Sequence, residues 1–258
     1  MAARIGFDGV LFDLGNTLIP FTPKDSMEFV VKWYHCADLS DDKIPFTEFL
    51  EVFRSVVRRE RERSKAEVWE STVPVRAQMM KDEMERRGFK IENIEMGLRS
   101  THTGAFTTCL RPRSSGRYVL NIMNSAVNEN DEPVKVGLVS NAIDGEALRR
   151  FLDRESWNSL FGSIVISGDV NMAKPSPLIF KRCLEELDLD PMRSVYIGDR
   201  WEADVLGPRS LGMSSVYIRE HHTAGEPPEG VKIDVPVINN ILDLIPLLEE
   251  GFPRDNGM

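Results

Sequence analysis

Four short stretches of the sequence place reactive or charged side chains directly after, or close behind, apolar runs. They are FDLGNTL at 12–18, LVSNA at 138–142, KPSP at 174–177 and GDRWEAD at 198–204. The residues of interest within them are Asp13, Ser140, Asn141, Lys174, Asp199 and Asp204. A nucleophilic carboxylate, a hydroxyl donor, a cation and two metal-ligand carboxylates form a working set for phosphoryl transfer. Each residue alone also fits a turn, a helix cap or a solvated side chain, so the inference depends on whether the fold brings them together.

The elements that must position these residues can be predicted from the apolar pattern. Short apolar runs typical of buried strands lie at 9–13, 134–139, 164–167, 195–198 and 214–218. Helical patterns alternate with the later runs, at 143–154, 177–188, 202–212 and 240–249. Such alternation predicts an α/β fold with a doubly wound, Rossmann-like parallel sheet covered on both faces. In this fold, ligands bind beyond the carboxyl ends of the strands, where the four stretches would converge.

The segment after the first strand has a different pattern, because it contains no strand-like run and its apolar residues fall at helical spacing. The clearest amphipathic stripe is Phe46, Phe49, Leu50, Phe53, Val56 and Val57. We interpret the charge run RRERERSK at 58–65 as the solvated face and end of that helix, not as a nucleic-acid contact. We therefore expect a helical cap over residues 22–126, inserted into a core formed by 1–21 and 127–258.

Composition narrows the class of protein. A chain of 258 residues with 41% hydrophobic residues suits a soluble globular protein, and its net charge of -9 opposes binding to the nucleic-acid backbone. No apolar run is long enough to span a membrane, and Asp8 and Asp13 interrupt the N-terminal apolar segment, which argues against a signal peptide. The three cysteines show no metal-ligand spacing, so we expect reduced thiols. We expect a cytoplasmic protein without nucleic-acid or membrane partners.

Taken together and in this order, the four stretches resemble the motifs of the haloacid dehalogenase-like hydrolase superfamily. The first and last are the more specific, and the resemblance extends over 7–19 and 134–219. The predicted insert is similar to the family's helical cap only in position and approximate size. The resemblance implies a Mg²⁺-dependent phosphatase that hydrolyses a small phosphorylated metabolite through an aspartyl-phosphate intermediate.

The resemblance also implies a role for each matching residue. Asp13 would be the nucleophile, Ser140 and Asn141 would bind the phosphoryl group, and Lys174 would neutralise developing charge and hold the nucleophile. Magnesium would be held by Asp13, Asp199 and the carbonyl of Gly15, with Asp204 supporting it directly or through water. This set makes physical sense, because a carboxylate attacking a phosphate needs cations to screen the repulsion between two anions. Asp8 precedes the first strand, so we interpret it as part of a surface turn.

Gly15 departs from the family pattern. Most phosphatases of the family carry a second aspartate there, which protonates the leaving alcohol and then activates water, and such proton transfer is worth about 10² to 10⁴ in rate. Three activities therefore stay open. A phosphatase is favoured by the carboxylates of GDRWEAD; a carbon-halogen or carbon-phosphorus hydrolase would also lack the second aspartate; a degenerate member would bind a phosphometabolite or a partner protein without turnover.

Several other polar or aromatic residues have a simpler structural interpretation. In the predicted cap, Lys24, Arg76 and His102 could reach an anionic or sugar substrate, but we expect solvent exposure for each. His221 and His222 are adjacent, point opposite ways on an extended segment and have no third ligand nearby, so we expect exposed loop residues. Trp201 either walls the site or packs under the cap. Pro208 lies inside a predicted helix, where it would kink or shorten it.

Overall fold

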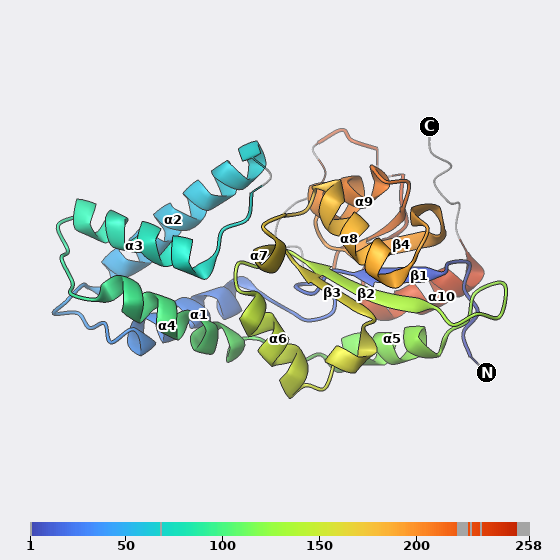
Figure 1. Cartoon of the computed structure of the whole chain (residues 1–258), viewed down its shortest axis with the longest axis horizontal. Coiled ribbons are helices and arrows are strands. Elements are labelled where there is room, and N and C mark those ends of the chain that lie inside the picture. The colour runs from blue at the N-terminus through green and yellow to red at the C-terminus, as the bar shows by residue number, and fades with distance from the viewer. Residues whose placement is uncertain (1, 68, 221–226, 228, 233, 252–258) are drawn as a thin grey trace.

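The apolar runs form one six-stranded sheet in the computed structural model, which describes residues 2–67, 69–220, 227, 229–232 and 234–251 (Figure 1). Its strands are β1 (Gly9–Phe12), β2 (Lys135–Ser140), β3 (Ser163–Ile166), β4 (Ser194–Gly198), β5 (Ser214–Ile218) and β6 (Val237–Ile238). The strand order is β3-β2-β1-β4-β5-β6, and every neighbouring pair is parallel. This is the Rossmann order, so the predicted doubly wound fold is confirmed. β6 was not predicted, because a strand of two residues is too short to show a periodic apolar pattern.

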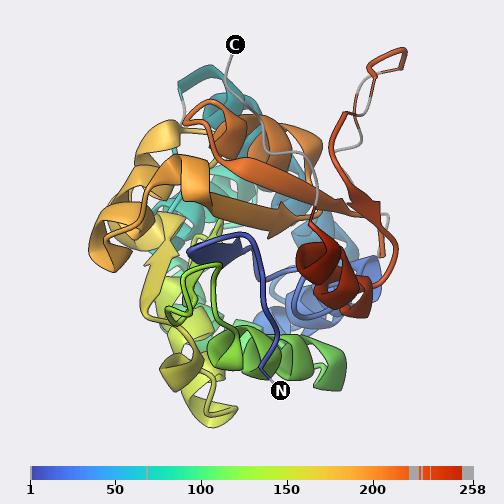
Figure 2. The ribbon, with the colours of Figure 1, turned by 90° about the vertical axis from the view of Figure 1, so that its right-hand side faces the viewer.

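Alternation along the strands sends successive side chains to opposite faces of the sheet. On β1, Val10 and Phe12 pack into one hydrophobic cluster, whereas Leu11 packs into another. The first cluster is covered by α5 (Ser114–Ser125), α6 (Gly145–Arg154) and α10 (Leu244–Glu250), and the second by α8 (Pro177–Leu187). Figure 2 shows α5 in green and α10 in red on one side of the strands. The sheet is therefore buried on both faces.

Short helical turns complete the connections of the sheet. They are η1 (Asn158–Leu160), α7 (Ser167–Val170), η2 (Pro191–Arg193), η3 (Trp201–Leu206), α9 (Gly207–Arg209) and η4 (Ile241–Asp243). The predicted single helix over 202–212 is wrong, because η3 is a π-helical turn that leads into the short α9. Pro208 follows the π-helical turn with only Gly207 between them, and the backbone of Leu206 and Gly207 is already helical. The helical stretch ends at Arg209, one residue after the proline, so it is shorter than predicted.

Four helices between β1 and β2 pack around a hydrophobic cluster of their own, beside the sheet (Figure 1). They are α1 (Pro23–Cys36), α2 (Phe46–Glu67), α3 (Val73–Arg86) and α4 (Ile94–Thr107). α1 begins at a capping box, in which the Thr22 side chain accepts from Asp25 N–H and the Asp25 side chain accepts from Thr22 N–H. In the described part of the chain, no helix is both long enough and apolar enough to cross a membrane.

α5 differs from these four helices in its packing. Its apolar residues Val119, Leu120 and Met123 belong to the cluster under the sheet, not to the cluster of α1–α4. The division into 22–126 and the remainder of the chain stays a prediction, and the packing of α5 supports a boundary closer to residues 108–113, between α4 and α5.

α5 also holds the loop that follows β1. A Cβ added to Gly116 would lie 2.1 Å from the carbonyl oxygen of Leu18. We expect Gly116→Ala to lower the free energy of unfolding by about 1–3 kcal/mol, because the backbone must shift to admit the methyl group. Gly104→Ala is the matched control, since a Cβ at Gly104, inside α4, meets nothing within 4 Å. That variant should gain about 0.5–1 kcal/mol from helix propensity. Equal changes of the free energy of unfolding in the two variants, measured by urea denaturation, would contradict the packing argument.

Candidate active site

The strand order reverses at β1 and β4, and the first two carboxylates lie there. Asp13 directly follows β1, and its N–H donates to the carbonyl of Ile197 on β4 at 2.9 Å. Asp199 directly follows β4. Crevices at such a switch point are where doubly wound sheets bind ligands. The two carboxylates are therefore brought together by neighbouring strands although they are far apart in the sequence.

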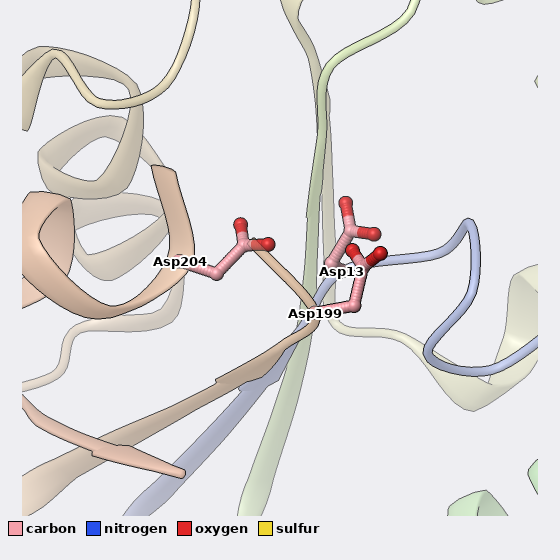
Figure 3. Close-up of side chains that lie close together, drawn as sticks. All are labelled: Asp13, Asp199 and Asp204. Carbon is pink, nitrogen blue, oxygen red and sulfur yellow. The ribbon is translucent and has the colours of Figure 1, made fainter. Parts of the chain in front are cut away.

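A third carboxylate, Asp204, reaches the same place from the π-helical turn η3. Carboxylate oxygens of Asp13, Asp199 and Asp204 lie within 4.8 Å of one another (Figure 3). Asp204 is held by Arg200, whose N–H donates to Asp204 Oδ2 at 2.9 Å. A Cβ at Gly198 would lie 2.4 Å from Asp204, so only glycine permits this approach of the turn to the end of β4. We call these three residues the carboxylate centre.

Lys174 bridges two members of the carboxylate centre. Its ammonium nitrogen lies 2.7 Å from Asp13 Oδ1 and 2.7 Å from Asp204 Oδ1, and all three side chains are buried. Lys174 Nζ also donates to the hydroxyl of Tyr196 at 2.8 Å, and that hydroxyl donates to the Val139 carbonyl at 2.6 Å. Sequence reasoning missed Tyr196, because an aromatic residue in an apolar strand gives no sign of a polar contact.

The electrostatics of the centre match a divalent cation. Burial and then the Asp204 charge raise the pKa of Asp13 against the opposing effect of Lys174, and burial with the Asp13 and Asp204 charges raises the pKa of Asp199 to about 8. Burial alone would lower the pKa of Lys174, but the charges of Asp13 and Asp204 outweigh it and raise that pKa. When all three carboxyl groups are ionised, Lys174 neutralises one negative charge, and a divalent cation would neutralise the other two. Carboxylate oxygens whose negative charge is not compensated suit Mg²⁺, a hard cation.

Ser140 and Asn141 lie at the same edge of the sheet. Leu138 pairs with Phe12, so Ser140, two residues further on and buried, lies beside the end of β1. The Asn141 amide accepts from Lys174 N–H at 2.9 Å and donates to the Lys174 carbonyl at 3.0 Å. Asn141 therefore holds the lysine loop in place, a role that the sequence did not indicate. Contacts of both residues with a phosphoryl group stay predictions.

Gly15 lies two residues beyond Asp13 in the loop between β1 and α1. The loop folds back on itself through a backbone bridge between Gly15 and Ile19 and a hydrogen bond from Phe21 N–H to Asn16 Oδ1 at 2.9 Å. A Cβ at Gly15 would meet nothing within 4 Å. The position therefore has room for a side chain, and the predicted metal contact of the Gly15 carbonyl stays a prediction.

One residue of the helical insert touches the edge of the sheet without having been predicted. Glu70, on the connection between α2 and α3, accepts from Ser167 Oγ at 2.6 Å, and Ser167 Oγ accepts from Ala142 N–H at 2.8 Å. Burial raises the pKa of the Glu70 carboxyl. Ala142 follows Asn141 directly, so the Ser167 hydroxyl links Glu70 to the loop after β2. No pattern around Glu70 indicated this contact, because the residue lies in a connection between two predicted helices and far from Ser167 in the sequence.

Of the three polar cap residues expected to be exposed, two are buried or half-buried and paired with a carboxylate. His102 is buried, and its Nδ1 lies 2.7 Å from Asp144 Oδ2, so the expected exposure is wrong. It is wrong for Arg76 as well, which pairs with the buried Glu60 at 2.6 Å. Lys24 is exposed as expected.

Two further predictions concern the chain after β4. Trp201 is the first residue of η3, is buried and packs edge-on against Tyr217 of β5, so it belongs to the hydrophobic packing of the core and not of the cap. His221 and His222 lie outside the described residues. Asp8 precedes β1 as expected and pairs with Arg193, away from the carboxylate centre.

Comparison with known proteins agrees with this geometry. A family model described as haloacid dehalogenase-like hydrolase matches residues 76–218, more than half of the chain. The chain belongs to this family of hydrolases. The predicted family is thereby confirmed, and the matched range includes the stretches at 138–142, 174–177 and 198–204. The roles that the resemblance implies for the residues of the carboxylate centre stay predictions.

Similar proteins within the family include two curated enzymes and a solved structure. A glyceraldehyde 3-phosphate phosphatase of Methanothermobacter thermautotrophicus is 27% identical over 157 residues, which are 60% of this chain and 66% of the relative. A pyrimidine 5′-nucleotidase of Escherichia coli is 34% identical over 98 residues, 38% of this chain and 42% of the relative. The match thus spans less than two thirds of either relative. A 2-haloacid dehalogenase from Pseudomonas syringae has the same fold, with a TM-score of 0.66 at 16% identity over 92% of this chain and 96% of that one.

Replacing Lys174, whose ammonium group bridges Asp13 and Asp204, should destabilise the metal-free protein. We expect Lys174→Met to lower the free energy of unfolding by about 3–5 kcal/mol at pH 8, because buried carboxylates lose their partner. The loss should be smaller at pH 5, since the Asp13 carboxyl group, whose raised pKa rises further without the lysine, then binds a proton and loses its charge. Denaturation in EDTA at both pH values measures the difference. Lys135→Met, at the opposite end of β2 where Nζ bonds the carbonyls of Leu187 and Asp188, should show no such pH dependence.

Proposed function

We propose that this hydrolase is a Mg²⁺-dependent phosphatase that acts on a small phosphomonoester through an aspartyl-phosphate on Asp13. The observation that carries the proposal is the Lys174 bridge between Asp13 and Asp204, next to Asp199, at the switch point of the sheet. The two curated relatives are a phosphatase and a nucleotidase, which supports phosphomonoester chemistry. The likeness to a dehalogenase concerns the fold alone.

The geometry supports the following roles. The Asp13 carboxylate attacks phosphorus while the bond between phosphorus and the leaving oxygen breaks, and water later cleaves the acyl phosphate to release inorganic phosphate and restore Asp13. Lys174 keeps Asp13 in one orientation and stabilises negative charge on the transferred group. Ser140 and Asn141 flank the position of that group. Asp13, Asp199, Asp204 and the Gly15 carbonyl would hold Mg²⁺, which supplies the remaining positive charge when bound.

The carboxylate centre also favours this reaction over carbon-halogen hydrolysis. A phosphate dianion brings more negative charge to the nucleophile than a carbon-halogen bond, so a phosphatase needs a cation site beside Asp13. Three carboxylates, of which Lys174 contacts only Asp13 and Asp204, provide such a site. For a halide-releasing enzyme, the same arrangement would place uncompensated charge next to the nucleophile without a use.

The first test is phosphate release from aryl phosphates and a panel of phosphometabolites. Activity should require Mg²⁺, vanish with EDTA and fall at least about 10³-fold in Asp13→Asn, because the amide cannot attack phosphorus. Asp8→Asn, which removes a carboxylate at the other end of the same strand, should keep activity near that of the wild type. Halide release from 2-haloacids without phosphate release, or unchanged turnover in Asp13→Asn, would overturn the proposal.

The second test restores the proton donor that Gly15 lacks. The free space around Gly15 allows Gly15→Asp to place a carboxyl group near the leaving oxygen. We expect turnover of alkyl phosphates to rise about 10²-fold, whereas an aryl phosphate with an acidic phenol should change less than about threefold, since it leaves without a proton. Gly15→Asn controls for size. Equal acceleration of both esters, or by both variants, would show that proton transfer is not the missing contribution.

A further inference from the structure

A hollow in the helical insert has the character of a binding site. Its volume is about 560 Å³, and it lies between residues 23–30 of α1 and residues 50–62 of α2. Apolar side chains form much of its lining, among them Met27, Leu50, Phe53 and Val57. We call it the arginine hollow, because Arg54, Arg58 and Arg61 of α2 also line it.

The three arginines share one face of α2, since they are spaced by four and three residues. All three are exposed, and within the described ranges none has a hydrogen-bond or ion-pair partner. Neighbouring arginines of the insert differ: Arg59 pairs with Glu83 and Arg76 pairs with Glu60.

The charge of the hollow stands out against the rest of the chain. Glu62 is the one carboxylate among the lining residues, so the hollow carries an excess of positive charge in a chain whose net charge is -9. Guanidinium groups bind carboxylate and phosphate oxygens through paired N–H donors. An apolar wall beside unpaired guanidinium groups therefore suits an anion attached to an apolar stretch.

Both helices that line the hollow are joined to connections that lead to the sheet: α1 follows the loop after β1, and the connection after α2 contacts the residue after β3. α1 begins at Pro23, a lining residue, and the folded loop of Gly15 to Phe21 keeps this helix start close to Asp13. α2 runs toward the sheet again, because the connection after it brings Glu70 to Ser167 at the end of β3. A ligand that extends from Asp13 toward the start of α1 would therefore approach the lining of the hollow at Pro23.

We propose that the arginine hollow binds the distal end of the substrate, and that the substrate class is a phosphomonoester whose leaving group carries a second oxyanion joined through an apolar stretch. This inference rests on the proposed phosphatase function. The phosphate would bind at the carboxylate centre with its cations, and the second oxyanion would bind the guanidinium groups of Arg54 and Arg58, which are four residues apart on one face of α2. Arg54 and Arg58 are then specificity-determining residues that affect binding of the leaving group and not the bond-breaking step.

The test compares two esters that differ only in the distal charge. 4-(Carboxyalkyl)phenyl phosphate and the matching carboxamide have the same phenol as leaving group, because the alkyl chain insulates it from the substituent. For the wild type we expect kcat/KM about tenfold higher for the carboxylate, mainly through KM. In Arg54→Gln/Arg58→Gln the ratio should fall to about one, while kcat/KM for the carboxamide stays within about twofold.

Arg99→Gln is the matched control, since Arg99 is an exposed arginine of α4 outside the hollow. It should keep the tenfold preference, and thermal melting should show that all variants fold. Hydrolysis of both esters by the wild type at equal kcat/KM would overturn the inference and leave the phosphatase proposal intact, as would a preference that survives in the double variant.

Failure of the phosphatase proposal gives a different result, in which neither ester releases phosphate. Calorimetry with the phosphate-free 4-(carboxyalkyl)phenol then tests the hollow alone. Binding by the wild type and Arg99→Gln that is lost in Arg54→Gln/Arg58→Gln would support an oxyanion site. No binding by the folded wild type would overturn it.

Discussion

The contact of the buried Lys174 ammonium with the carboxylates of Asp13 and Asp204 is the interaction on which the rest of the site depends. Burying these charges costs several kcal/mol per ion, and only close, well-directed contacts offset that cost. The surrounding residues provide them. The Tyr196 hydroxyl takes a third donor position of the ammonium, the Asn141 amide holds the lysine backbone, and Gly198 lets the turn with Asp204 approach. The strand ends are thus tied together by charge as well as by the sheet.

Lys174 is one cation among three carboxylates, so the centre has an excess of negative charge when these are ionised. The hollow in the helical insert has an excess of positive charge. The sheet edge presents unneutralised carboxylates that suit a metal ion, whereas the hollow between α1 and α2 presents unpaired guanidinium groups. A substrate with two anionic ends would therefore be oriented by charge, with the transferred phosphate at the metal-binding end. The contact of Glu70 with Ser167 ties the connection after α2 to the residue that follows β3.

Gly15 limits the chemistry of this arrangement without disturbing its geometry. The loop around it is closed by the Gly15–Ile19 bridge and the Asn16–Phe21 hydrogen bond, and it has room for the missing side chain. In the proposed phosphatase, the nucleophile and the charged groups around it would be complete, and the proton for the leaving group would have to come from a source other than residue 15. Such an enzyme would turn over esters of acidic leaving groups more readily than those of simple alcohols.

The sequence by itself determined the order of strands and helices, the parallel sheet and the residues that end its strands, because apolar periodicity reports which side chains are buried and on which face. It also indicated the carboxylate set through motif order. Only the tertiary structure decided that Lys174 bridges Asp13 and Asp204, which are 161 and 30 residues away, and that Glu70 reaches Ser167 across 97 residues. It also decided the π-helical turn at Asp204, the pairing of His102 with Asp144, and the packing of α5 under the sheet. Periodicity specifies burial but not partners, and partners follow from how the elements pack.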